Sequence, residues 1–218
     1  MFLNERMRKA FIVCILLFLG DVSSVSAQYD VEEELPPFEM AERLMRKNMC
    51  DKAEAIYRKE YSKDSSKRMF YGVVKSLTCQ RKFEEANQLA RYNMALDTNE
   101  TGNYWYLALN YMKWNQADSS VFYLKRYISK SEKLAELGKG NAFKGEQPKA
   151  WLYIGNIYRI KMHNEGITDK EWIDMVYAFE RYLALNPKDE SVFALREFIE
   201  HVRVKRPEPT EILIWNEH

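Results

Sequence analysis

Residues 104–127 read YWYLALNYMKWNQADSSVFYLKRY, and this stretch decides the fold of the chain. Each half carries apolar or small residues three and four positions apart, a spacing that puts them on one face of a helix. The polar pair Asn115 and Gln116 separates the two halves. The stretch therefore predicts two amphipathic helices joined by a short turn. Their inward positions are Tyr104, Leu107, Ala108 and Tyr111 in the first helix and Ser120, Leu124 and Tyr127 in the second.

The same pattern recurs along the chain with a period of about 34 residues. One period earlier the corresponding residues are Phe70, Val73, Val74 and Leu77, then Ala86, Ala90 and Asn93. Two periods earlier they are Met40, Ala41 and Leu44, then Ala53, Tyr57 and Glu60. The copy ahead has Trp151, Ile154, Gly155 and Tyr158, followed after a longer gap by Met175, Phe179, Tyr182 and Pro187. A single helix pair cannot bury its apolar face alone, so the repetition indicates stacked pairs that share one core.

These residues resemble the tetratricopeptide repeat (TPR) family, whose units carry an aromatic residue, a Leu-Gly step, a Tyr, small residues and a final Pro. The unit that matches most closely has WLYIGNIY at residues 151–158 and ALNP at residues 184–187. The first unit is degenerate, with Glu60 where a small residue is usual. The resemblance covers nearly all of residues 37–187. It implies an all-α, right-handed α-solenoid of about four helix pairs plus a C-terminal capping helix, with a concave partner-binding groove and no particular reaction.

The predicted organisation has four parts. Residues 1–27 are a signal peptide, residues 28–36 a flexible acidic leader, residues 37–202 the TPR domain and residues 203–218 a tail. The units of the domain are predicted at about residues 37–66, 67–99, 100–137 and 148–187, with a cap at 189–202. Two stretches interrupt the period. A helix stop at Gly138 begins the first, and a capping box formed by Thr168 and Glu171 ends the second.

The N-terminal segment has the three parts of a secretory signal. Arg6, Arg8 and Lys9 form the charged start, residues 10–20 (AFIVCILLFLG) the apolar run, and residues 25–27 (VSA) a cleavage site of small residues. The apolar run is short for a membrane span, although a retained anchor is the alternative. We therefore expect an exported bacterial protein, periplasmic or extracellular, with no integral membrane span after cleavage.

Composition argues against several classes of function. The chain has 33 basic and 32 acidic residues in mixed order, whereas a nucleic-acid binder needs a basic face for phosphate contacts. No paired CxxC or HxxxH spacing indicates a metal site, and His163, His201 and His218 stand outside any catalytic motif. We expect no enzymatic activity, no cofactor, no bound metal and no nucleic-acid partner.

Two cysteines, Cys50 and Cys79, remain after the predicted cleavage. The repeat register places Cys50 in the inner turn of unit one and Cys79 near the end of the first helix of unit two, at the same edge of the stack. An oxidising compartment permits a disulfide there, provided that the Cα atoms come within about 7 Å. Two buried, unpaired thiols are the alternative, and both remain open.

The tail contains a short apolar run after Pro207, formed by Ile212, Leu213, Ile214 and Trp215. These side chains are too large to leave in water without a reason. The run either folds back over the last helices or docks on another chain, by strand addition or groove insertion. The second alternative includes a dimer formed through the tail.

The TPR resemblance also implies which residues bind a ligand, because the family lines its groove with the first helix of each unit. Carried over by register, these residues are Tyr71 and Lys75 from unit two, Trp105, Leu109, Met112 and Lys113 from unit three, and Leu152, Asn156 and Arg159 from unit four. Their rings supply anchoring area and their cations hold acidic groups. Some family members clamp a terminal carboxylate with paired Lys and Asn residues, and only Asn156 has a comparable place here. Alternatively, Trp105 and Met112 complete the core between helices.

The repeats favour a non-catalytic scaffold that binds a protein or peptide segment within an exported assembly. A glycan-binding module of the bacterial cell envelope is the alternative. Large outer-membrane sugar-binding proteins also contain TPR helices, and exposed rings of Trp105 and Tyr71 would stack on sugar rings. Those proteins are much longer and usually lipidated, which favours the scaffold.

Overall fold

The computed structural model describes residues 35–139, 146–188 and 192–215. The chain divides into two units, Met1–Pro36 and Pro37–His218, and all the helices named below belong to the second. The predicted signal peptide and all but the last two positions of the acidic leader lie outside the described residues. The structure therefore bears on the predicted repeat domain and on most of the tail.

The described part of the chain is all-α, as predicted. Its helices are α2 (Pro37–Arg46), α3 (Cys50–Asp64), α4 (Lys67–Cys79), α5 (Phe83–Leu96), α6 (Gly102–Lys113), α7 (Ala117–Glu136), α8 (Gln147–Asn164), α9 (Asp169–Leu185) and α10 (Val192–Arg203). They pack as the pairs α2–α3, α4–α5, α6–α7 and α8–α9, and α10 then packs on α9. This confirms the predicted four helix pairs followed by a capping helix.

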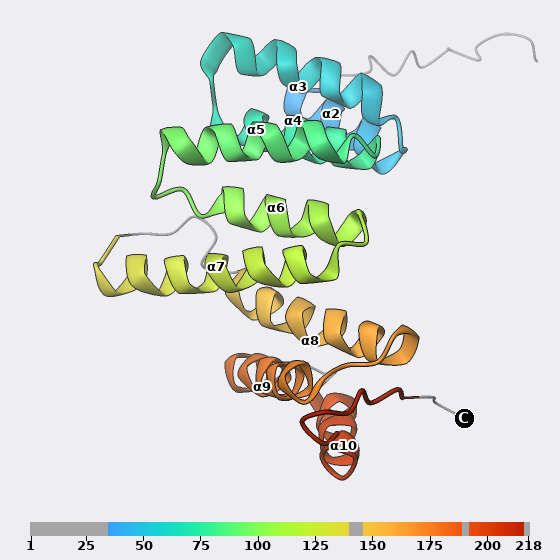
Figure 1. Cartoon of the computed structure of the whole chain (residues 1–218). Helices are drawn as coiled ribbons and strands as arrows, with labels where there is room; N and C mark the ends of the chain where they lie inside the picture. The colour runs from blue at the N-terminus through green and yellow to red at the C-terminus, as the bar shows by residue number, and fades with distance from the viewer. Residues whose placement is uncertain (1–34, 140–145, 189–191, 216–218) are drawn as a thin grey trace, which may run out of the picture. The chain divides into compact units, whose positions relative to one another are not determined.

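Each pair also packs on the next pair. α3 contacts α4, α5 contacts α6, and α7 contacts α8, while the first helices of units two and three, α4 and α6, contact each other directly. Figure 1 shows α6, α7, α8, α9 and α10 following one another in chain order. In a repeat solenoid each unit contacts its neighbours in the stack, and the helices described here pack in this way.

The core consists of two clusters of buried side chains. The first spans α2 to α5 around Tyr57 and Leu77, and the second spans α6 to α10 around Tyr127 and Phe179. Tyr106 of α6 packs against both clusters. The two clusters therefore form one continuous core at the junction between α4 and α6.

The inner turns of the first three pairs share one backbone conformation. Asn48, Arg81 and Asn115 have φ of 58°, 62° and 60°. The residue after each donates its N–H to the carbonyl five positions back at 2.9 Å, from Met49 to Leu44, from Lys82 to Leu77 and from Gln116 to Tyr111. This pattern is the Schellman closure of a helix C-terminus. The left-handed conformation costs Arg81 about 1–2 kcal/mol, so the repeated turn rather than local preference determines its backbone.

Two helix ends in the second half follow the predicted local signals. α7 runs to Glu136, and Gly138, with φ 65°, lies just beyond it. The predicted capping box opens α9: the Thr168 N–H donates to Glu171 Oε2 at 2.9 Å, and the Glu171 N–H donates to Thr168 Oγ1 at 3.3 Å. Both predictions are confirmed. The sequence was sufficient for them because each helix end depends only on residues that are neighbours in the chain.

Cys50 and Cys79 form a disulfide, which selects one of the two alternatives that the sequence leaves open. Their Cα atoms lie 6.0 Å apart, inside the range that a disulfide can bridge. The bond joins the first residue of α3 to the last residue of α4. Beside it, the Gln80 side chain donates to the Cys50 carbonyl at 3.2 Å and to Glu54 Oε2 at 2.6 Å.

The tail folds back on the last helices, which was one of its two predicted alternatives. Leu213 forms an antiparallel bridge with Ile167 in the turn between α8 and α9. Trp215 is 7% exposed, and its ring packs against Phe198 and His201 of α10. Figure 1 shows the tail, in dark red, returning past α10. The side chains at positions 212 and 214, in contrast, are 61% and 56% exposed, whereas Leu213 is half-buried and Trp215 is buried.

Candidate binding groove

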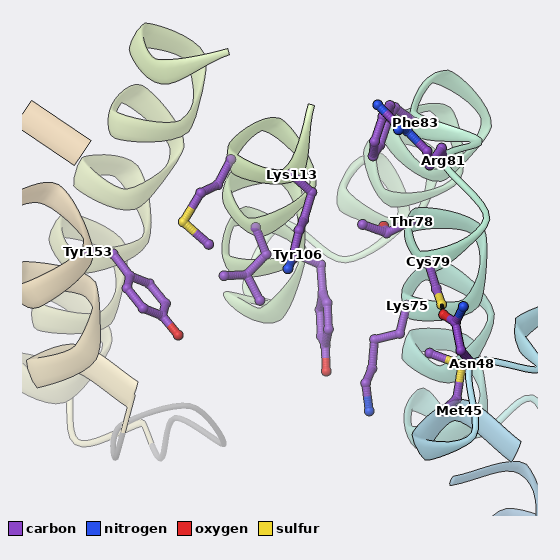
Figure 2. Close-up of a pocket in the computed structure, with 12 residues that line it drawn as sticks. Met45, Asn48, Lys75, Thr78, Cys79, Arg81, Phe83, Tyr106, Lys113 and Tyr153 are labelled. Atoms are coloured by element: carbon purple, nitrogen blue, oxygen red, sulfur yellow. Dashed lines mark hydrogen bonds between the residues drawn. The ribbon is translucent and has the colours of Figure 1, made fainter. Parts of the chain in front are cut away.

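A hollow of about 640 Å³ is lined by the first helices of the four pairs, by the turns that follow α2 and α4, and by the first residue of α5. Figure 2 shows Tyr106 of α6 between Tyr153 of α8 on one side and Lys75 of α4 on the other. A second hollow of about 210 Å³ shares Lys75 and Tyr106 with the first. We call the two together the binding groove. It is lined by Phe38, Glu42, Met45, Asn48, Arg68, Tyr71, Gly72, Lys75, Thr78, Cys79, Arg81, Phe83, Tyr106, Leu109, Met112, Lys113 and Tyr153.

Five of the residues predicted from register line the groove. They are Tyr71, Lys75, Leu109, Met112 and Lys113. All five come from α4 and α6. The groove is therefore built mainly on units two and three.

The other four predicted residues lie outside the groove. Trp105 is 6% exposed, and its ring stacks on that of Tyr153 with 5.6 Å between centroids, so it belongs to the core between helices. Arg159 lies over an aromatic ring of α10, 5.6 Å from its centroid. Leu152 packs against the core, and Asn156 is half-buried without lining either hollow. Among the described residues of α8, only Tyr153 lines the groove.

The rings required by the glycan-binding alternative are not exposed. Tyr71 and Trp105 are each 6% exposed. Tyr71 also stacks on Tyr106, with 4.5 Å between ring centroids and 20° between planes. Neither predicted ring therefore offers a free face to a sugar.

Register reasoning missed the other lining residues, among them Tyr106, Tyr153 and Arg81. Tyr106 follows Trp105 directly and Tyr153 follows Leu152, so a shift of one position separates the predicted residues from the observed ones. Arg81 lies in the turn after α4, outside the helical pattern altogether. Arg81 has the same left-handed backbone conformation as Asn48 in the preceding unit, and Asn48 also lines the groove. This equivalence between the two turns is the signal that identifies Arg81.

Charge in the groove is predominantly positive. Four cations, Arg68, Lys75, Arg81 and Lys113, line it together with one carboxylate, Glu42. Lys75 pairs with Glu42 at 2.9 Å, whereas no described residue forms an ion pair with Arg81 or Lys113. The positive electrostatic potential of the groove therefore favours an acidic ligand.

The Glu42 carboxylate is held in its charged form. Burial alone raises the pKa of Glu42, but hydrogen bonds donated by Tyr57 Oη at 2.6 Å and Lys75 Nζ at 2.9 Å outweigh burial and leave the pKa below its usual range. Burial also raises the pKa of Tyr106 to about 12, and burial and the charge of Glu100 raise that of Tyr71. At neutral pH both tyrosines are therefore protonated, and the Tyr71 hydroxyl is buried.

Neither a metal centre nor a membrane span is found in residues 35–139, 146–188 and 192–215. No three His, Cys, Asp or Glu side chains gather there in a way that would hold a metal ion. No helix in those ranges is both long and apolar enough to cross a membrane.

No protein-family model matches the chain, and no curated protein does. Among solved structures, the chain is similar to the kinesin light chain nearly identical TPR-like repeats of Podosopora anserina. The similarity to a variant form of these repeats has a TM-score of 0.53 at 15% identity and covers 78% of this chain and 86% of that chain. A second crystal structure of the repeats gives a TM-score of 0.53 at 14% identity with the same coverage. At this identity the likeness concerns the fold, and the fold of this chain is a TPR-like repeat.

Proposed function

We propose that the protein is a non-catalytic scaffold whose groove binds an extended segment of a partner protein. The observation that carries the proposal is the placement of Arg81 and Lys113, cations without an ion-pair partner in the described residues, along the same hollow as Leu109 and Met112. Apolar side chains of a ligand gain from burial on such a surface, while cations select and orient its acidic groups. The preferred segment therefore combines acidic and apolar residues.

The construction of the groove suits a segment of chain. Its walls come from four successive first helices, from Met45 of α2 to Tyr153 of α8. Helices that are packed on a common core keep these side chains in place before a ligand arrives, which lowers the entropic cost of binding. Met45 and Met112 add flexible apolar surface that adapts to different ligand side chains.

We propose further that the scaffold acts in an exported bacterial assembly, in the periplasm or outside the cell. Two observations support this location. Residues 1–27 have the pattern of a secretory signal, and the Cys50–Cys79 disulfide suits an oxidising compartment. Fusion of residues 1–27 to a reporter enzyme that is active only after export tests the proposal, and a reporter that stays inactive contradicts it.

Peptide display against the full-length protein tests the binding function. Selection from a random peptide library is expected to enrich sequences that combine acidic and apolar residues. The enriched peptides should bind the Arg81→Gln/Lys113→Gln variant about tenfold more weakly, because each lost cation removes a charge-assisted contact. Affinity for the wild-type protein should also fall as salt is added.

A matched control separates the groove from general charge. Lys133 is exposed in the last turn of α7 and does not line the groove, so Lys133→Gln should leave peptide affinity unchanged. Enrichment of basic peptides, or equal binding by the groove variant and the wild type, would contradict the proposed function.

A further inference from the structure

The folded-back tail presents one open backbone edge. The Leu213 N–H donates to the Ile167 carbonyl at 2.9 Å, and the Ile167 N–H donates to the Leu213 carbonyl at 3.0 Å. Main-chain groups of successive residues in a strand point to opposite sides. The N–H and C=O groups of Ile212 and Ile214 therefore point away from Ile167, and no described residue forms a backbone hydrogen bond with them.

The tail segment that carries this edge, residues 212–215, packs against the turn before α9. Gly166 has φ 85°, and a Cβ on it would lie 2.2 Å from Ile212 Cγ2 and 3.0 Å from Ile214 Cγ1, so the strand lies directly on the backbone of the turn. Trp215 anchors the end of the strand: its N–H donates to the Met162 carbonyl at 3.2 Å and its side chain is buried. The edge is thus preorganised, which reduces the entropic cost of pairing with another strand.

We propose that the partner of this edge is the same segment of a second copy of this chain. The sequence Ile212-Leu213-Ile214 reads the same in both directions. Antiparallel pairing centred on Leu213 therefore sets Ile212 of each copy opposite Ile214 of the other. These are the residues whose main-chain groups point outward, so each opposed pair exchanges two hydrogen bonds. Their side chains, 61% and 56% exposed in the single chain, form cross-strand pairs.

The pairing leaves no open edge on the described strand of either copy, and it brings no like charges together there. It joins two tails and two α8–α9 turns in one small antiparallel sheet related by a two-fold axis, and both open edges are used in it. Glu211 lies opposite Trp215 of the other copy, so no like charges face each other across the described strand. Pro207 and Pro209 limit the strand on its N-terminal side, which keeps the edge short and discourages further strand addition.

The interface is separate from the binding groove. The tail packs on the turn after α8 and on α10, whereas the groove is built mainly on α4 and α6. The inference therefore does not depend on the proposed function. Loss of the dimer would leave peptide binding in place, and loss of peptide binding would leave the dimer.

Analytical ultracentrifugation of the full chain over a wide range of concentration tests the dimer. The wild type is expected to pass from monomer to dimer as concentration rises. Ile214→Pro removes an outward N–H but keeps both Leu213–Ile167 hydrogen bonds, and we expect it to weaken dimerisation about tenfold or more. Val204→Ser is the control, because Val204 is 86% exposed and lies outside the strand. A wild type that stays monomeric throughout, or an Ile214→Pro variant that dimerises normally, overturns the inference.

Cysteine crosslinking tests the register. Opposed residues in a hydrogen-bonded antiparallel pair have Cα atoms about 5.5 Å apart, which a disulfide can bridge. A mixture of Ile212→Cys and Ile214→Cys chains should therefore crosslink more than either variant alone, and the unmodified chain reports the background from the native cysteines. Equal crosslinking in all three samples of the variants contradicts pairing about Leu213.

Discussion

Cys50 and Cys79 fasten the first helix pair to the second, with 6.0 Å between their Cα atoms. The bond lies at the groove, because Cys79 lines it together with Asn48 and Met45 from the end of the first pair. The first pair is also the degenerate repeat and has no described unit before it to cover its outer face. The disulfide therefore joins the degenerate first repeat to the second, and it holds one wall of the groove.

Removal of the disulfide should destabilise the protein. The bond closes a loop between residues 29 positions apart, and we expect Cys50→Ala/Cys79→Ala to lower the free energy of unfolding by about 3 kcal/mol. Chemical denaturation followed by circular dichroism measures the change. A thiol reductant should destabilise the wild type and leave the variant unaffected. Superimposable unfolding curves for wild type and variant would refute the prediction.

Gly155→Ala should destabilise the last helix pair. A Cβ at this position lies 2.4 Å from Phe179 Cε1, and the Phe179 side chain is fully buried. Overpacking of this kind costs typically about 1–3 kcal/mol. Thermal unfolding measures the loss. The double variant Gly155→Ala/Phe179→Leu should lose less stability than the sum of the two single variants, and additive losses would show that the ring is not the cause.

Thr168→Ala should weaken the start of α9. The substitution removes the hydroxyl that accepts from the Glu171 N–H and frees the Glu171 carboxylate from one of its hydrogen bonds. Loss of an N-cap typically costs about 1 kcal/mol. Thr168→Ser keeps the hydroxyl and should retain most of the stability. Hydrogen exchange of the first turn of α9 gives a local readout, and unchanged protection there would argue against a capping role.

Acid should destabilise the protein partly through Glu42. Its pKa is lowered in the folded state from 4.5, because hydrogen bonds from Tyr57 and Lys75 outweigh the effect of burial. A group with a lowered folded pKa stabilises the fold above its unfolded pKa, and this contribution is lost as pH falls through the folded value. The free energy of unfolding of the wild type should therefore fall more steeply below pH 4.5 than that of Glu42→Gln. Parallel slopes for the two proteins would contradict the assignment.

The sequence by itself determined the helix pairs and several of their ends. Inward residues such as Leu107 and Leu124 recur at helical spacing, and that spacing specifies a helix wherever it later packs. Gly138 and the Thr168–Glu171 box mark helix ends through bonds to residues within a few positions. These predictions succeeded because the interactions behind them are local.

The tertiary structure decided which aromatic residues form the core and which line the groove. A first helix of a repeat faces its own partner helix, the next unit and the groove, and neighbouring residues are turned by about 100° from each other. Trp105 and Tyr106 are equally suited to apolar surroundings, yet Trp105 is buried beside Tyr127 whereas Tyr106 lines the groove. Spacing defines positions within one helix, but the rotation of that helix against its neighbours depends on packing across the whole stack.

The disulfide and the tail depended on tertiary structure for the same reason. Both alternatives for Cys50 and Cys79 agreed with the sequence, and only the packing of α3 on α4 brings their Cα atoms within range. The sequence of the apolar run does not indicate which of its side chains are buried. The pairing of Leu213 with Ile167 decides this. That pairing buries Trp215 and leaves the isoleucines on either side of Leu213 exposed, because the side chains of a strand alternate between its two faces.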